Sequence, residues 1–132
     1  MTGFLLVASG GALGAVARYG LGLIFSRLIP GAAWPWATLS ANLIGGFLMG
    51  LLAGWLAAKA GANQEMIRLF GAVGLLGGFT TFSAFSLETI VMLERREIVP
   101  ALGYVLASVV LAIAAVFVGL MIARKLFTGV GA

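Results

Sequence analysis

Residues 74 to 88 read Gly-Leu-Leu-Gly-Gly-Phe-Thr-Thr-Phe-Ser-Ala-Phe-Ser-Leu-Glu, in the middle of an apolar stretch long enough to cross a membrane. The segment holds a glycine pair, four hydroxyl side chains and three phenylalanines. A helix that only anchors a protein can be built from Leu, Val and Ala, whereas helix-breaking and polar residues at membrane depth are typical of irregular backbone that lines a cavity. We therefore expect a broken helix beside an ion path.

The composition of the whole chain indicates an integral membrane protein. Hydrophobic residues make up 62% of the 132 residues and charged residues only 9%, far from the averages of soluble domains. Because each crossing needs roughly 20 apolar residues, the chain has room for a single all-α transmembrane domain, residues 1–132, with four spans. We predict these spans near residues 4–25, 36–58, 66–93 and 99–123.

The residues that are missing argue against an enzyme. The chain has no His, no Asp and no Cys, so a Ser-His-Asp triad, a zinc site and a disulfide all lack their usual parts. Residues 1–22 could be read as a secretory signal, but no basic residue precedes the apolar run. We expect a retained first helix.

The net charge of +4 fits membrane anchoring better than nucleic-acid binding, because the basic residues are spread among the span ends. The predicted topology divides them between two faces: Lys59, Arg68, Arg124 and Lys125 on one, and Arg27, Arg95 and Arg96 on the other. The two faces thus carry four and three basic residues, and Arg18 would make the numbers equal. Under the positive-inside rule, such a nearly equal distribution predicts that chains insert in both orientations. Such insertion permits an antiparallel homodimer. The small size argues independently for an oligomer, since four helices cannot enclose a shielded pore and cover their own polar groups.

Glycines at four-residue spacing indicate close helix packing. Gly46, Gly50 and Gly54 form such a stripe in the second span, and Gly10 and Gly14 repeat it in the first. Small residues let membrane helices approach closely. Packing alone is the favoured interpretation of these glycines.

Two polar side chains lie inside the first two spans. Arg18 should face water, protein or an anion, because a charge at membrane depth costs about 2.5 to 3.5 kcal/mol; the alternative is an arginine that snorkels toward the interface. Asn42 follows Thr38 by four residues, so both lie on one helical face. Its amide could donate to a mobile anion or serve as interhelical glue.

The last two spans carry further candidates. Tyr104 and Ser108 repeat the four-residue spacing, although a lone membrane serine usually bonds to its own helix. Phe82 and Phe85 lie three apart, and their rings could present positive edges to an anion or simply pack. Glu88 follows near the end of the third span, in a vestibule or at the interface. If the helix unwinds near Gly77 to Thr80, freed carbonyls could coordinate Na⁺.

Three motifs resemble the Fluc fluoride channel family, also called CrcB: residues 10–19 (GGALGAVARY), residues 38–46 (TLSANLIGG) and residues 77–86 (GGFTTFSAFS). The resemblance covers essentially the whole chain in length, span number and motif order. The third motif is highly specific, whereas the first would be weak alone.

The resemblance implies a dual-topology antiparallel homodimer in the cell inner membrane that exports fluoride passively from the cytoplasm and gives fluoride resistance. It implies a structural Na⁺ at the dimer interface, held by the backbone carbonyls of Gly77 and Thr80. Matching positions assign the fluoride path to Thr38, Asn42, Thr81, Phe82, Ser83, Phe85, Tyr104 and Ser108, and the vestibules to Arg18 and Glu88. The sequence departs from the family's pattern in two places: Ala84 stands where many relatives have a hydroxyl, and Ala112, one turn after Ser108, cannot extend the row of polar side chains.

The main rival is a small proton-coupled multidrug exporter, which is also a four-span antiparallel dimer. That chemistry needs a buried carboxylate, usually in the first span, and here Glu88 is the only intramembrane acid. A non-transporting accessory subunit would leave the polar third span unexplained. Fluoride efflux without proton coupling discriminates between these alternatives.

Overall fold

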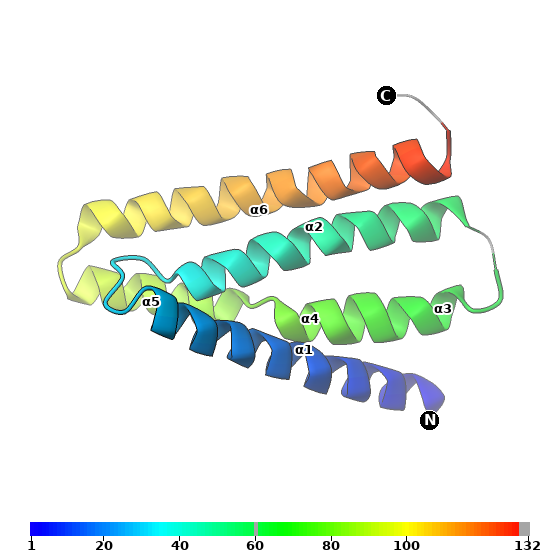
Figure 1. The fold of residues 1–132 in the computed structure, drawn as a ribbon, viewed down its shortest axis with the longest axis horizontal. Helices are drawn as coiled ribbons and strands as arrows, with labels where there is room; N and C mark the ends of the chain where they lie inside the picture. Colours follow the sequence, from blue (N-terminus) through cyan, green and yellow to red (C-terminus); the bar gives the residue numbers. More distant parts are fainter. Residues whose placement is uncertain (60, 130–132) are drawn as a thin grey trace.

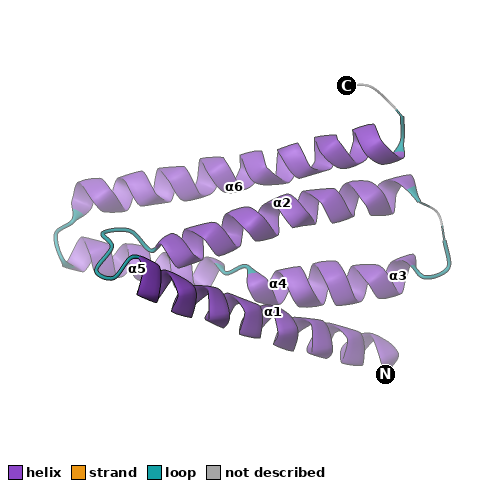
Figure 2. Ribbon diagram, in the orientation of Figure 1, coloured by secondary structure: helices purple, strands orange, loops and turns teal. Residues whose placement is uncertain are grey.

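The computed structural model describes residues 1–59 and 61–129, and within these ranges every regular element is helical (Figure 2). The elements are α1 (Thr2–Leu28), α2 (Trp36–Ala58), α3 (Gln64–Ile67), η1 (Arg68–Leu76), α4 (Gly77–Phe79), α5 (Phe82–Glu94) and α6 (Ile98–Phe127) (Figure 1). Here η1 is a π-helix, and α3 to α5 with η1 make up the third span. Four segments are long and apolar enough to cross a membrane: 2–28, 36–58, 64–94 and 98–127. The predicted all-α, four-span architecture is confirmed.

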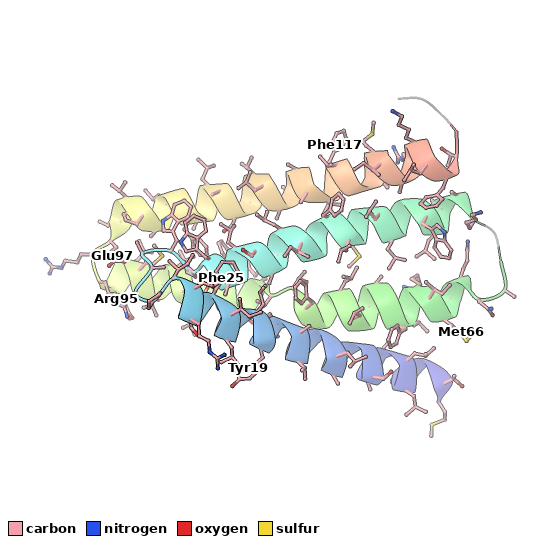
Figure 3. All side chains as sticks on the ribbon, in the orientation of Figure 1. Tyr19, Phe25, Met66, Arg95, Glu97 and Phe117 are labelled. Atoms are coloured by element: carbon pink, nitrogen blue, oxygen red, sulfur yellow. The ribbon has the colours of Figure 1, made fainter. Side chains whose placement is uncertain are left out.

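The chain runs back and forth along one long axis, so that α1 and the third span run in one direction while α2 and α6 run in the other (Figure 1). The N-terminus, the α2–α3 connection and the end of α6 lie at one end of the bundle, and the α1–α2 and α5–α6 connections lie at the opposite end (Figure 1). Side chains cover the bundle on all sides; Met66 lies at the first end and Arg95 and Glu97 at the second (Figure 3).

The first glycine pair brings α1 against the third span. A Cβ added at Gly10 or Gly14 would collide with backbone atoms of η1 and α4, among them the carbonyl oxygens of Phe70 and Leu75. The two backbones are therefore in direct contact, which only glycine permits. The predicted role of these glycines in close packing is confirmed.

The glycine stripe of the second span packs against α6. A Cβ on Gly50 would overlap the Val116 carbonyl oxygen, and one on Gly119 of α6 would overlap that of Phe47. Gly54 would meet Ala123 in the same way. Where lipid supplies no hydrophobic drive between helices, this close approach maximises van der Waals contact, so the prediction of packing holds here too.

The third span is broken, at a place that differs slightly from the predicted one. Thr80 (φ −82°, ψ 157°) and Thr81 (φ −154°, ψ 122°) are extended, while Gly77 to Phe79 remain helical. The expected unwinding of Gly77 to Thr80 is wrong for its first three residues. Gly78 is used for packing instead, since a Cβ there would meet the Gly11 backbone.

Candidate functional site

A groove of about 300 Å³ opens beside the break in the third span. It is lined from α2, α5, α6 and the break itself by Asn42, Thr80, Thr81, Phe82, Phe85, Ser108, Val109, Ala112 and Ile113. Five of the eight residues predicted for the fluoride path therefore meet around one space: Asn42, Thr81, Phe82, Phe85 and Ser108. The two extended threonines let the backbone enter its wall, which a continuous helix would not allow.

Asn42 holds the broken backbone in place. Its Nδ2 donates to the Thr81 carbonyl at 3.0 Å, and its Oδ1 accepts the Thr81 N–H at 2.8 Å. Unpaired backbone groups at membrane depth cost several kcal/mol each, so this double pairing stabilises the break. Nδ2 has two hydrogens, and the second is not used by any described hydrogen bond.

Thr81 also starts the next helix. Its Oγ1 accepts the Ala84 N–H at 3.2 Å as an N-cap, and it lies 3.3 Å from the Ser83 hydroxyl. Threonine is a favoured N-cap because its hydroxyl satisfies an N–H that has no helical partner. The exposed Ser83 lies outside the lining of the groove.

Because the N–H groups of Thr81 and Ala84 bond to side chains, two backbone carbonyls are left without a donor. In a continuous helix the Thr81 N–H would bond to the Gly77 carbonyl and the Ala84 N–H to the Thr80 carbonyl. Here the first is given to Asn42 and the second to the Thr81 hydroxyl. Among the described residues, no hydrogen bond reaches either carbonyl oxygen. They are the two oxygens that the family resemblance names as ligands of Na⁺.

Ser108 presents an unsatisfied hydroxyl to the groove. The residue is 7% exposed, and its Oγ lies near the Tyr104 hydroxyl but forms no hydrogen bond with any described residue. Ser9, Ser26 and Ser86, by contrast, donate to carbonyls of their own helices. A buried polar group without a partner costs free energy, so this hydroxyl is available to a ligand in the groove.

The two phenylalanines of the groove differ in burial. Phe82 is 77% exposed and Phe85 only 8%. Their ring centroids lie 5.4 Å apart at an interplanar angle of 45°, and Phe85 makes a similar tilted contact with Tyr104 at 5.4 Å. Tilted rings direct edges as well as faces toward their neighbours, and ring edges carry positive charge.

Glu88 is held by hydroxyls from two other helices. Thr38 Oγ1 donates to Glu88 Oε1 at 2.6 Å, and the Tyr104 hydroxyl donates to Oε2 at 2.8 Å. The sequence predicted a role for each of these residues separately and missed the network. This hydrogen-bonded network joins α2, α5 and α6 next to the groove. Tyr104 is fully buried in the hydrophobic core.

Arg18 reaches the third span instead of turning away from it. Its Nε donates to the Gly78 carbonyl at 3.2 Å, and the side chain is partly buried. The carbonyl it contacts lies two residues before the break. Of the two interpretations that the sequence left open, the structure has the inward one, but the arginine contacts helical backbone just before the break and does not line the groove.

The fold and the site define a four-span helical membrane protein with one broken span and, at the break, a mainly apolar groove that contains an amide and hydroxyl side chains. A family model described as CrcB-like protein, Camphor Resistance (CrcB), matches residues 5–120. A protein of Caulobacter sp. strain K31 is 57% identical over 128 residues, covering 97% of this chain and 99% of the relative. Proteins of Hyphomonas neptunium (56% over 128 residues, 96% and 99% covered) and Paracoccus denitrificans (54% over 124 residues, 94% and 96% covered) are similar. All three carry the name fluoride-specific ion channel FluC.

The chain belongs to the CrcB-like family. Together with its four apolar helices, this membership makes it a multi-pass membrane protein of the bacterial inner membrane. The resemblance drawn from the three sequence motifs is confirmed.

Proposed function

We propose that this protein is a fluoride-selective channel that lets fluoride leave the cytoplasm passively and so gives fluoride resistance. The observation that carries the proposal is the groove at the break, where an amide, an unsatisfied hydroxyl and two phenylalanine rings converge from three helices. The relatives named as fluoride-specific channels support it at 54 to 57% identity. A channel is not an enzyme.

The groove suits an ion that must lose its water without being trapped. Fluoride is small and strongly hydrated, so its shell has to be replaced by donors along the path. The free hydrogen of Asn42 Nδ2, the Ser108 hydroxyl and the ring edges of Phe82 and Phe85 supply such donors without a full positive charge. Val109, Ala112 and Ile113 of α6 form the apolar part of the lining beside Ser108 and favour release because they hold no donor.

Arg18, Glu88, Thr38 and Tyr104 belong to the approach in this proposal. The basic Arg18 draws anions toward the third span, while the hydroxyls of Thr38 and Tyr104 are shared with Glu88. Ser83, whose hydroxyl lies 3.3 Å from that of Thr81, extends the hydroxyl-bearing surface beyond the lining of the groove.

The functional unit in this proposal is an antiparallel homodimer. The near-balance of basic residues at the two ends of the bundle supports insertion in both orientations. The exposed Phe82 and Gly77 support it further, because they leave one side of the break open to a second subunit.

The same assembly would hold Na⁺ at the break. No group of three or more His, Cys, Asp or Glu side chains that could bind a metal occurs in the described ranges, so a cation would depend on backbone oxygens. The free carbonyls of Gly77 and Thr80 fit a hard cation, which prefers oxygen ligands. Bound Na⁺ would supply positive charge there and satisfy oxygens that the break leaves without donors.

Fluoride efflux from liposomes tests the function. Purified protein is reconstituted in vesicles loaded with equal fluoride and chloride, and both ions are followed with selective electrodes after the membrane potential is clamped. We expect rapid fluoride release and retained chloride. Vesicles that hold both ions, or lose both at one rate, would refute a fluoride channel.

The rival exporter is tested in the same vesicles. A pH gradient should leave fluoride flux unchanged and should not drive uptake of a cationic dye. Proton-driven dye transport would favour the exporter, with Glu88 as its carboxylate.

A further inference from the structure

A second cavity, of about 280 Å³, lies at the end of the bundle where α1 joins α2. The residues that line it are mainly aromatic residues and residues with small side chains, together with one acidic residue. They are Gly22, Phe25, Ser26, Ile29, Gly31, Ala32, Trp34, Pro35, Trp36, Ala37, Thr38 and Glu88. Its volume lies near the lower limit of small-molecule sites. It shares no lining residue with the groove at the break.

A tight turn builds the aromatic wall. Pro35 (φ −75°, ψ 71°) has the geometry of an inverse γ-turn, and the Trp36 N–H donates to the Trp34 carbonyl at 2.9 Å across it. The turn places the two indole centroids 5.4 Å apart at 38°. Trp34 is seated against Gly103 and Tyr104 of α6, whereas Trp36 is 40% exposed.

Phe25 adds a third ring from α1, near the end of that helix at the α1–α2 connection (Figure 3). Three aromatic side chains, from α1, the α1–α2 connection and α2, therefore border one space. Rings that surround a cavity attract a cation through their negative faces.

The carboxylate of Glu88 completes the site. Each of its oxygens accepts one hydroxyl hydrogen, and a carboxylate has about four acceptor positions, so capacity remains for a further partner. No Lys or Arg lies among the described residues of the lining, so no fixed positive charge inside the cavity competes for it.

We propose that this cavity is a binding site for a small organic ammonium ion, such as a tetraalkylammonium or a choline-like group. The rings of Phe25, Trp34 and Trp36 surround its alkyl groups, and Glu88 balances its charge. An inorganic cation would gain little from this apolar wall, and an anion would be repelled. The site shares Thr38 and Glu88 with the proposed approach but no lining residue with the groove itself, and its test needs no fluoride.

Tryptophan fluorescence measures the binding directly. Trp34, Trp36 and Trp55 are the three tryptophans of the chain, so Trp55→Phe leaves reporters only at the cavity. In this background, in uncharged maltoside micelles, choline should change the emission in a saturable manner. Its uncharged isostere 3,3-dimethyl-1-butanol should bind at least about tenfold more weakly, since it lacks the cation–π attraction.

Two pairs of matched variants locate the site. Glu88→Gln keeps the shape and removes the charge, and should weaken choline binding by roughly tenfold or more. Glu94→Gln, on the same helix but outside the cavity, should leave binding unchanged. Trp36→Leu should weaken binding, and Trp36→Phe should restore part of it. Equal binding of choline and its isostere, or equal effects of Glu88→Gln and Glu94→Gln, would overturn the proposal, as would absence of a saturable change in folded protein.

Nanodiscs distinguish a free ion from a lipid headgroup of the same chemistry. If the headgroup of phosphatidylcholine occupies the site, added choline should bind more weakly in phosphatidylcholine nanodiscs than in phosphatidylglycerol nanodiscs. Equal affinity in both identifies the free ion as the ligand. Loss of saturable binding in both would contradict the site.

Discussion

Asn42 and Thr81 are joined by two hydrogen bonds of opposite sense, one from Nδ2 to the Thr81 carbonyl and one from the Thr81 N–H to Oδ1. Few side chains can do this, because the pairing needs a donor and an acceptor in one plane. The amide thus replaces the helical partners of Thr81 where the third span is broken.

Replacement of Asn42 by Asp should nearly abolish fluoride efflux from liposomes. A fixed negative charge about 4 Å from a passing anion costs roughly 4 kcal/mol at an effective dielectric constant of 20, and Asp cannot donate to the Thr81 carbonyl. Ser40→Ala, on the same helix but outside the groove, is the control and should conduct normally. Wild-type flux in Asn42→Asp would remove this residue from the path.

Substitutions of Phe82 and Phe85 should distinguish an effect on fluoride flux from an effect on the free energy of unfolding. Phe85→Ile changes a side chain that is only 8% exposed and should lower the free energy of unfolding by about 1 kcal/mol. Phe82→Ile changes one that is 77% exposed and should leave it nearly unchanged in the monomer. Both should reduce fluoride flux if the two rings solvate the ion.

Flux and denaturant titrations of the same preparations make the comparison. If Phe82→Ile conducts at the wild-type rate while Phe85→Ile does not, the loss in the latter is a packing effect and the paired-ring interpretation is wrong.

Much of the fold follows from patterns that are visible in the sequence. Four apolar runs define the spans, and Gly46, Gly50 and Gly54 predict the face of α2 that meets another helix. Such patterns are local or periodic, so one chain segment is enough to reveal them. The sequence did not name α6 as the partner, because a stripe of small residues says that a helix approaches closely and not which helix does so.

The site was predicted as a set of residues but not as a set of contacts. Thr38, Glu88 and Tyr104 come from three segments, and their hydrogen-bonded network depends on how α2, α5 and α6 pack. The position of the break was misjudged for a related reason. A glycine pair favours unwinding locally, yet Gly78 is needed for contact with Gly11, and the distant Asn42 stabilises Thr81 in the extended form.

Gly50→Ala should destabilise the protein by about 1 to 3 kcal/mol, since its Cβ would overlap the Val116 backbone and force α2 and α6 apart. Gly20→Ala is the matched control, because nothing lies within 4 Å of a Cβ at that helical position. It should be neutral or stabilising by up to about 1 kcal/mol through helix propensity. Unfolding in mixed micelles measures both, and equal effects would show that the α2–α6 contact does not depend on Gly50.

Removal of Na⁺ should weaken the proposed dimer. Protein prepared from the first step with N-methylglucamine in place of Na⁺ would leave the Gly77 and Thr80 carbonyls without a partner. Dimer dissociation, followed by energy transfer between labelled subunits, should occur at higher protein concentration than in Na⁺. An unchanged midpoint, with fluoride flux also unchanged, would count against a structural sodium ion.

Tyr104 and Glu88 should show a measurable energetic coupling. The Tyr104 hydroxyl donates to Oε2 at 2.8 Å, and hydrogen bonds to charged groups contribute about 1.5 to 3 kcal/mol. In a double-mutant cycle of Tyr104→Phe and Glu88→Gln, the coupling in unfolding free energy should be about 1 to 2 kcal/mol. Glutamine can still accept through its own oxygen, so the value should fall short of the full bond.

The cycle has an internal reference in Ser9, which bonds only to its own helix. Ser9→Ala combined with Glu88→Gln should be additive to within about 0.5 kcal/mol, because the two sites share no partner.

Thr38→Val should couple to Glu88→Gln as Tyr104→Phe does, since the Thr38 hydroxyl donates to the other carboxylate oxygen, Oε1, at 2.6 Å. Additivity of all three pairs would mean that the network contributes no net stability, and that the hydroxyls of Thr38 and Tyr104 are instead free to leave Glu88 for a passing anion.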